Sequence, residues 1–164
     1  MRSMSPSSIL RELKMERTLV LIKPDGVCKR LIGEVIRKIE LEGFKIVALK
    51  MIQFTEKKAR EFYRSHKGKH FFQGLIDFML TAPSVALIVE GEGVVKKIRE
   101  IIGERKPEDA SPETIRGKYA SDGRRNIVHG SDSPFSAEQE IRCLFNLEEI
   151  YSYDETDWLN SEPG

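Results

Sequence analysis

The hydrophobic pattern of the chain follows two periods, and together they predict an alternation of short strands and helices. Compact apolar runs are typical of buried strands, and four of them occur, at residues 17–23, 44–54, 84–91 and 126–130. Apolar positions spaced three or four apart are typical of amphipathic helices, and they occur at residues 31–43, 94–103 and 133–145. Residues 56–66 are expected to form a mostly polar helix capped by Thr55, and residues 71–80 an apolar helix. At least one predicted helix therefore separates each pair of consecutive strands.

This order of elements predicts an α/β (α+β) fold. Two strand–helix–strand halves in one chain indicate the ferredoxin-like plan, a split βαβ sandwich in which helices cover a four-stranded antiparallel sheet. Neither an internal repeat nor a linker is visible, so residues 16–164 are expected to form a single domain. The Ser-rich segment 1–15 is expected to be a flexible leader. Because this fold hosts many functions, the architecture alone assigns none.

Residues 104–125 follow neither period and are rich in proline, glycine, aspartate and basic residues. A structureless loop of this length is uncommon in a compact domain and usually serves a function. Its cations are Arg105, Lys106, Arg116, Lys118, Arg124 and Arg125. Guanidinium groups grip phosphate oxygens in bidentate fashion, so the loop is a candidate phosphate site; a solvated basic loop is the alternative. Arg99, beside the apolar face of its helix, and Lys23, at the end of a strand, extend this set.

Composition narrows the classes of function. The chain has 164 residues and a formal net charge of +1, so no overall field directs it to nucleic acid or to a membrane. Positive charge for an anionic ligand must therefore be gathered locally. The two cysteines form no metal or redox motif, and no apolar run reaches the ~20 residues of a membrane helix, so a cytoplasmic protein is expected. No glycine-rich phosphate-binding motif occurs, so a nucleotide would be held without a glycine cradle.

The segment N-I-V-H-G-S-D-S, residues 126–133, contains the candidate nucleophile. His129 ends a predicted strand, and Gly130 is expected to let the chain turn tightly and leave the imidazole facing a cavity. Glu140 lies at the edge of the apolar stripe of the next helix and leans towards the core, where a carboxylate needs a partner. A histidine–glutamate pair would fix the imidazole ring. The alternatives are a partly buried histidine bonded to backbone and a glutamate that reaches water.

These segments together resemble the nucleoside diphosphate kinases. The resemblance is carried by I-K-P-D-G at 22–26, F-F at 71–72, T-I-R-G at 114–117 and N-I-V-H-G-S-D-S with a glutamate in the following helix, and it extends from about Glu16 to Trp158. It implies a reversible ping-pong reaction, in which the γ-phosphate of a nucleoside triphosphate, mainly ATP, passes through a phosphohistidine to a nucleoside diphosphate such as GDP. It also implies a homo-oligomer, most often a hexamer.

The resemblance implies a role for individual residues. His129 would be the nucleophile, through the ring nitrogen nearer the attachment point, with Glu140 steadying the ring and Ser131 beside it. Phosphates and sugar would be held by Lys23, Arg99, Arg116 and Asn126, with Tyr63 near Lys23, and the platform for the base would be Phe71 and Leu75. No acidic or histidine cluster has metal-ligand spacing, so Mg2+ is expected to be held by the nucleotide phosphates and water. Stacking is nearly indifferent to the base, and broad base specificity is expected.

Three positions depart from the family pattern. Arg105 stands where a threonine that contacts phosphate is usual, and we expect arginine to replace that contact. Lys118 stands where aspartate is common and makes the loop more basic. Gly123 occupies a position that is typically aliphatic and covers the second face of the base, so a looser hold on the base is expected.

Three other functions are compatible with parts of the pattern. A catalytically silent family member would bind nucleotide without turnover, although the intact His129 and Glu140 argue against it. A phosphohydrolase would release phosphate from a phosphohistidine without an acceptor nucleotide. A nucleic-acid-binding protein would use the basic loop, but the near-neutral charge makes specific nucleic-acid binding the weakest of the three.

Overall fold

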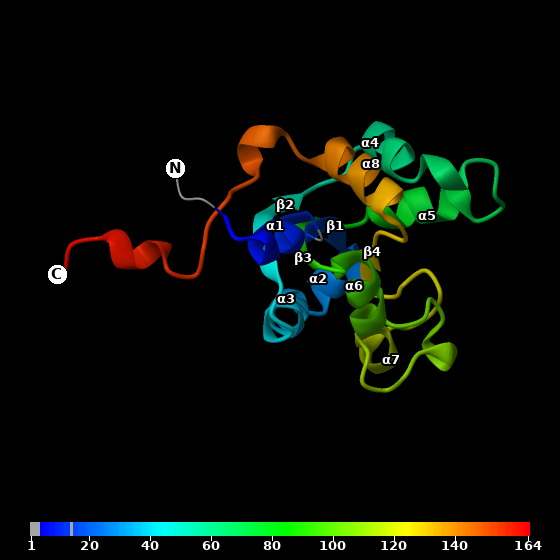
Figure 1. Cartoon of the computed structure of the whole chain (residues 1–164). Coiled ribbons are helices and arrows are strands. Elements are labelled where there is room, and N and C mark those ends of the chain that lie inside the picture. Colours follow the sequence, from blue (N-terminus) through cyan, green and yellow to red (C-terminus); the bar gives the residue numbers. More distant parts are fainter. Residues whose placement is uncertain (1–3, 14) are drawn as a thin grey trace.

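The computed structural model describes residues 4–13 and 15–164, and its centre is a four-stranded sheet (Figure 1). The strands lie in the order β2-β3-β1-β4, and each neighbouring pair is antiparallel. Their bounds are Met15–Ile22 (β1), Lys45–Ile52 (β2), Ser84–Glu92 (β3) and Val128–Gly130 (β4). The predicted ferredoxin-like sandwich is confirmed.

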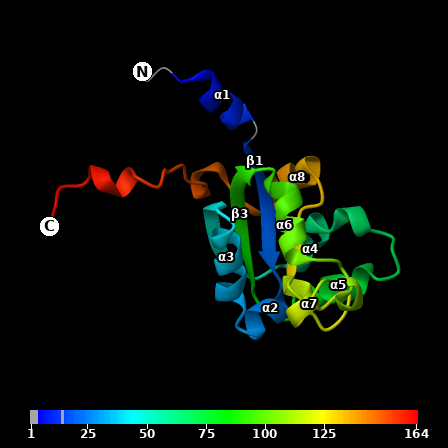
Figure 2. The same ribbon diagram turned by 60° about the horizontal axis from the view of Figure 1, so that its bottom comes forward.

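Helices cover both faces of the sheet, as Figure 2 also shows. One face packs against α4 (Glu56–Phe62), α5 (Phe72–Met79) and α8 (Pro134–Leu144). The other face packs against α3 (Ile32–Leu41), α6 (Val94–Ile102) and α7 (Ile115–Tyr119). The side chains of β1 alternate between these layers, with Leu19 and Leu21 in the first cluster and Val20 and Ile22 in the second. Because both faces are covered, β1 is an almost continuous apolar run.

The register of the edge strand β4 decides where the candidate nucleophile points. His129 lies opposite Leu21 of β1, so its side chain shares the sheet face covered by α4, α5 and α8. Its neighbours Val128 and Gly130 face α6 on the opposite side. Because successive side chains of a strand point to opposite faces of the sheet, the imidazole lies in the same layer as Glu140.

Several short elements were not predicted from the sequence. The predicted helix over 56–66 ends at Phe62 and is followed by the 3-10 turn η1, Arg64–His66. Within the expected leader lies α1 (Pro6–Leu13), and within the expected structureless loop lie η2 (Pro107–Asp109) and α7. The other unpredicted elements are α2 (Pro24–Cys28), η3 (Leu147–Glu149) and η4 (Asp157–Asn160). Helices of three to eight residues have few periodic positions and depend on tertiary contacts, so a pattern search misses them.

The C-terminal segment, residues 151–164, begins beside β2, where the N–H of Tyr151 donates to the carbonyl of Val47 at 2.8 Å, and its later part extends away from the body of the fold in both ribbon views. Its side chains are exposed, including Tyr151 and Trp158. No helix among the described residues is long and apolar enough to cross a membrane.

Candidate active site

A strained turn precedes His129 and joins two of the motifs. Ile127 has a φ of 74°, a region that a β-branched residue rarely adopts. The backbone N–H of Val128 donates to the carbonyl of Asn126 at 2.8 Å, which makes the segment a γ-turn. Asp25 Oδ2 accepts the N–H of Ile127 at 2.9 Å, and the N–H of Lys23 donates to the Ile127 carbonyl at 2.8 Å. The K-P-D-G loop therefore holds the turn that precedes His129.

The imidazole of His129 is oriented by Glu140 of α8. Its Nε2 is hydrogen-bonded to Glu140 Oε1, and the buried Ser131 hydroxyl donates to the same oxygen at 3.1 Å. Because a carboxylate only accepts, Nε2 carries the proton of the neutral ring and Nδ1 keeps its lone pair. Nδ1 has no hydrogen-bond partner among the described residues. The predicted histidine–glutamate pair is present, and the free nitrogen is the one nearer the attachment point of the ring.

Aromatic rings and a glycine fix the place of His129. Phe62 and Tyr63 lie edge-on to the imidazole, with ring centroids at 5.2 and 6.2 Å. Gly130 has an ordinary backbone conformation, so the predicted need for a tight turn is wrong. A Cβ at Gly130 would lie 2.7 Å from Ile102 Cδ1 and 3.2 Å from Ile98 Cγ2. A side chain there would have to displace Ile102, because α6 packs directly on β4.

Lys23 is buried beside this turn, and its Nζ points towards Asn126 of the N-I-V-H-G-S-D-S segment. Its Nζ donates to Asn126 Oδ1 at 2.9 Å and to the carbonyl of Arg124 at 2.5 Å. Burial lowers the pKa of Lys23 from 10.5 to about 7, although the nearby Asp25 opposes this shift. The amide of Asn126 donates in turn to the carbonyls of Arg105 and Gly123. Lys23 and Asn126 therefore form one hydrogen-bonded unit at the wall of the cavity.

Two arginines extend this positive wall. The Arg116 guanidinium donates to the carbonyls of Gly103 and Val128, while its buried Nε has no partner. Burial and the neighbouring guanidinium groups of Arg99 and Arg105 lower the pKa of Arg116 to about 10. Arg99 donates to the carbonyl of Gly130 at 3.1 Å. Like charges that gather without a counter-ion favour the binding of an anion between them.

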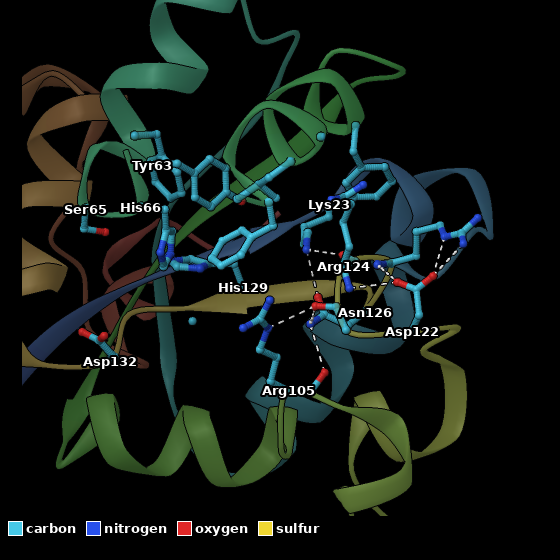
Figure 3. Close-up of a pocket in the computed structure, with 18 of the residues that line it drawn as sticks. Lys23, Tyr63, Ser65, His66, Arg105, Asp122, Arg124, Asn126, His129 and Asp132 are labelled. Atoms are coloured by element: carbon cyan, nitrogen blue, oxygen red, sulfur yellow. Dashed lines mark hydrogen bonds and ion pairs between the residues drawn. The ribbon is translucent and has the colours of Figure 1, made fainter. Parts of the chain in front are cut away.

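These side chains line one open cavity of about 930 Å³. Figure 3 shows His129 near its centre, with Lys23, Arg105 and Asn126 on the other side from Ser65 and Asp132. The cations on its wall are Lys23, Arg99, Arg105, Arg116, Arg124 and Arg125. Of these, only Arg125 forms an ion pair within the described part of the chain, with Asp122. The expected local gathering of positive charge is present, although Lys106 and Lys118 of the basic loop lie outside the wall.

The remaining predicted residues also reach the cavity. Phe71 and Leu75 of the α5 region line it together, which is the arrangement expected for a base platform. Tyr63 lines it as well, but its hydroxyl donates to Met79 Sδ, and burial raises the pKa of this phenol, which therefore stays protonated. Arg105 lies over the ring of Phe71, with Cζ 5.1 Å from the centroid. The cavity wall thus includes ten of the eleven residues that the sequence proposed for catalysis or nucleotide binding; the exception, Ser131, contacts Glu140.

Sequence reasoning missed Asp25, Phe62 and the contact between Arg124 and Gly74. Asp25 was interpreted only as part of a turn, and its contact with Ile127 joins residues 102 positions apart. Phe62 was assigned to a mostly polar helix, and its contact with His129 depends on tertiary packing. Arg124 packs on Gly74 of α5, where a Cβ would lie 2.5 Å from its guanidinium. The adjacency of Gly74 to the F-F motif was the only available signal for this contact.

The carboxylates near the cavity do not form a metal site of their own. No group of three or more histidine, cysteine, aspartate or glutamate side chains within residues 4–13 and 15–164 could hold a metal ion. A divalent cation fits this cavity only when an anionic ligand supplies most of its oxygen ligands.

Comparisons with known proteins identify the family. Residues 16–150 match the family described as nucleoside diphosphate kinase. A nucleoside diphosphate kinase of Carboxydothermus hydrogenoformans is 48% identical over 142 residues, which span 87% of this chain and 95% of the relative. Its solved counterpart from Aquifex aeolicus has a TM-score of 0.82 and 44% identity, with 84% of this chain and 99% of that one covered.

A second solved structure extends the likeness to a protein with a bound ligand. The nucleoside diphosphate kinase of Halobacterium salinarum, in complex with CDP, has a TM-score of 0.84 and 37% identity, over 90% of this chain and 99% of that one. The family match covers the sheet, all helices of both layers and the whole cavity wall. The chain therefore belongs to the nucleoside diphosphate kinase family, whose members are phosphotransferases that act between nucleotides.

Proposed function

We propose that this phosphotransferase works by a ping-pong mechanism through a phosphohistidine on His129. The lone pair of Nδ1 attacks the γ-phosphorus of a nucleoside triphosphate, mainly ATP, and the bond from that phosphorus to the β–γ bridging oxygen breaks. The nucleoside diphosphate leaves, and a β-phosphate oxygen of a second one, such as GDP, attacks the phosphorus in the same cavity. The P–Nδ1 bond breaks, and its electron pair returns to Nδ1 of His129. Two transfers through one nitrogen let both nucleotides use one site in turn.

One observation carries this proposal. Glu140 fixes Nε2 of His129, and the unpartnered Nδ1 belongs to a ring that lines a cavity with five cations lacking a carboxylate partner. In phosphoryl transfer the charge spreads over the moving phosphoryl group, so catalysis requires position and fixed positive charge more than proton transfer. The cavity supplies both.

Each remaining residue has a place in the proposed mechanism. Lys23, Arg99 and Arg116 hold phosphate oxygens, and Asn126 positions Lys23 and the sugar. Phe71 and Leu75 support the base, while Arg105 belongs to the nucleotide-binding set. The Tyr63 ring holds the imidazole in place from its edge. Ser131 and Glu140 are positioning residues, since they act on the nucleotide only through His129.

Mg2+ is proposed as the cofactor, held by the nucleotide phosphates and by water. The donor set supports this mode, because the described residues around the cavity offer cations and isolated carboxylates rather than a cage of ligands. The ion would supply charge neutralisation on the phosphates. Lys23, Arg99 and Arg116 would share this task through direct contacts with the phosphate oxygens.

The state of the protein in the cell is also proposed. Residues 16–164 form the catalytic domain, which acts as a hexamer in the cytoplasm and has neither a membrane nor a specific nucleic acid as partner. Exposed apolar side chains on the edge strand β2, Leu49 and Met51, and in the C-terminal segment support self-association. Both cysteines, Cys28 and Cys143, are free, which fits a reducing compartment. Sedimentation velocity of the full chain tests the hexamer.

Steady-state kinetics tests the mechanism. With ATP and GDP varied together, a ping-pong mechanism gives parallel double-reciprocal lines, and His129→Gln abolishes turnover while nucleotide binding persists. Intersecting lines, or turnover by His129→Gln, would contradict a phosphohistidine intermediate. Phosphate release without GDP at the rate of transfer would instead establish a phosphohydrolase.

A further inference from the structure

Arg105 occupies the space above the proposed base platform. Its guanidinium carbon lies 5.1 Å from the centroid of the Phe71 ring, and its Nε donates to the carbonyl of Gly123 at 3.3 Å. No carboxylate pairs with Arg105 among the described residues. The rings of His66 and His70 flank Phe71, each with its centroid 5.5 Å away, and so hold the platform in place. The planar guanidinium of Arg105 therefore covers the Phe71 ring, which we propose as the platform for the base.

Gly123 lies beside Arg105, whose Nε donates to its carbonyl, and leaves space for the guanidinium. A Cβ built on Gly123 would meet nothing closer than Arg105 Nε and Lys106 Cγ, both at 3.9 Å, and the backbone of Gly123 is outside the left-handed region. Neither space nor conformation requires glycine at this position. The absence of a side chain at Gly123 leaves the far side of the slot to the guanidinium of Arg105.

Resting on the proposed function, we infer that the base inserts between the Phe71 ring and the Arg105 guanidinium, and that this slot favours purine over pyrimidine nucleotides. Two stacked contacts of about 3.5 Å each need roughly 7 Å between the outer planes. Arg105 is exposed, and it swings outward to admit the base. A guanidinium stacks on aromatic faces as a planar cation. A two-ring base covers more of both surfaces than a single ring does.

This assignment differs from the one expected from the family pattern, in which Arg105 replaces a phosphate contact. The phosphate cations Lys23, Arg99 and Arg116 are anchored by backbone carbonyls or by Asn126. Arg105 also donates to a backbone carbonyl, that of Gly123, but its guanidinium lies over the ring of Phe71. Its replacement should therefore change the discrimination between bases rather than the grip on phosphate.

Calorimetric titration of the full-length protein with ADP, GDP, CDP and UDP tests the inference. The wild type is expected to bind the purine nucleotides about tenfold more tightly than the pyrimidine ones, within the range that stacking supplies. Arg105→Lys keeps the charge but removes the plane, and it should weaken purine binding about tenfold and pyrimidine binding only about twofold. The KM for purine nucleotides should rise more than the KM for pyrimidine nucleotides. Lys106→Met is the matched control, because it removes a cation from the same loop outside the cavity.

A second pair of variants separates stacking from phosphate binding. Arg105→Thr should abolish the purine preference, and Arg105→Thr combined with Gly123→Val should restore tight binding without that preference, since an aliphatic side chain then covers the base. Equal losses for all four nucleotides and for tripolyphosphate in Arg105→Lys would overturn the inference in favour of a phosphate contact. Labelling of His129 by saturating ATP tests the proposed function separately, because its outcome does not depend on which base is preferred.

Discussion

Asp25 Oδ2 accepts the backbone N–H of Ile127 at 2.9 Å and thereby connects the loop after the first strand to the strained turn before His129. The two residues belong to different motifs of the sequence, and each motif depends on the other for its conformation. Gly26 permits this contact, because a Cβ there would lie 2.7 Å from the Ile127 carbonyl oxygen. The position of His129 is therefore determined partly by Asp25 and Gly26, which do not line the cavity.

Removal of the Asp25 carboxylate should release the turn. Asp25→Ala leaves the N–H of Ile127 without its acceptor, and the free energy of unfolding is expected to fall by about 1–3 kcal/mol. The kcat should fall as well, because the strained conformation of Ile127 loses a restraint. Denaturant titration followed by circular dichroism measures the first effect. Asp25→Asn is the control, since its amide oxygen can still accept; a loss of stability equal to that of Asp25→Ala would contradict this account.

A methyl group at Gly130 should separate β4 from α6. Gly130→Ala places a Cβ 2.7 Å from Ile102 Cδ1, and such overpacking typically costs about 1–3 kcal/mol of unfolding free energy. Ile102→Val removes that Cδ1, so the double variant should recover part of the loss. A double-mutant cycle by thermal or chemical unfolding measures the coupling. Additive effects of the two substitutions would show that the α6 contact is not the reason for glycine.

Loss of the Glu140 carboxylate should slow phosphorylation without weakening nucleotide binding. Glu140→Ala removes the acceptor of both His129 and Ser131, so the ring loses its orientation, and kcat is expected to fall about 100-fold with little change in KM. Rapid-quench measurement of a single turnover reports this step. Glu138→Ala, on the exposed face of the same helix and paired only with Arg142, is the matched control. Equal kcat values for Glu140→Ala and Glu138→Ala would contradict a positioning role for Glu140.

Nucleotide binding should charge Lys23. Its pKa of about 7 leaves the amine mostly neutral in the free protein at pH 8.5, and nearby phosphates favour the protonated form. Binding of ADP at this pH is thus expected to take up nearly one proton, and affinity should fall as pH rises above 7. Calorimetry in buffers of different ionisation enthalpy counts the protons. Lys23→Arg, which is charged throughout, and Lys23→Met should take up none; equal uptake in all three proteins would contradict the assignment.

The same pKa predicts how stability responds to pH. Between pH 7 and 10.5 the unfolded chain binds a proton at Lys23 that the folded chain lacks. The contribution of this group to the unfolding free energy therefore rises with pH across that window. Lys23→Met removes this contribution, so the stability profile of the variant should be flatter from pH 7 to 10.5.

The layers of the fold could be predicted from the sequence because they depend on local period. The strand around Leu19–Ile22 and the helix around Val95–Ile102 present apolar side chains at fixed spacing, and both are confirmed. The short helices α2 and α7 were missed, because five residues contain no readable period. The backbone of α7 packs closely on a preceding segment, since a Cβ at Gly117 would lie 2.0 Å from the carbonyl oxygen of Ser111.

The site was predictable where chemistry and spacing coincide. Glu140 lies at the edge of the apolar stripe of its helix and His129 lies in the short strand before that helix, so their pairing followed from the pattern and from the need of a carboxylate for a partner. The contacts of Asp25 with Ile127 and of Arg105 with Phe71 join segments far apart in the chain. Only the arrangement of the sheet brings those segments together, so no local pattern indicates them.

Phosphorylation of the protein itself tests the central claim most directly. The chain is incubated with γ-labelled ATP and Mg2+ in the absence of an acceptor, and then challenged with GDP. The account predicts one label per chain that survives alkali, is lost in acid, resides on Nδ1 of His129 and moves to GDP. His66→Gln and His70→Gln, at the neighbouring histidines, should label normally, while His129→Gln should not label at all. No label on a wild-type protein that demonstrably binds ATP, or a label that persists in His129→Gln, would contradict it.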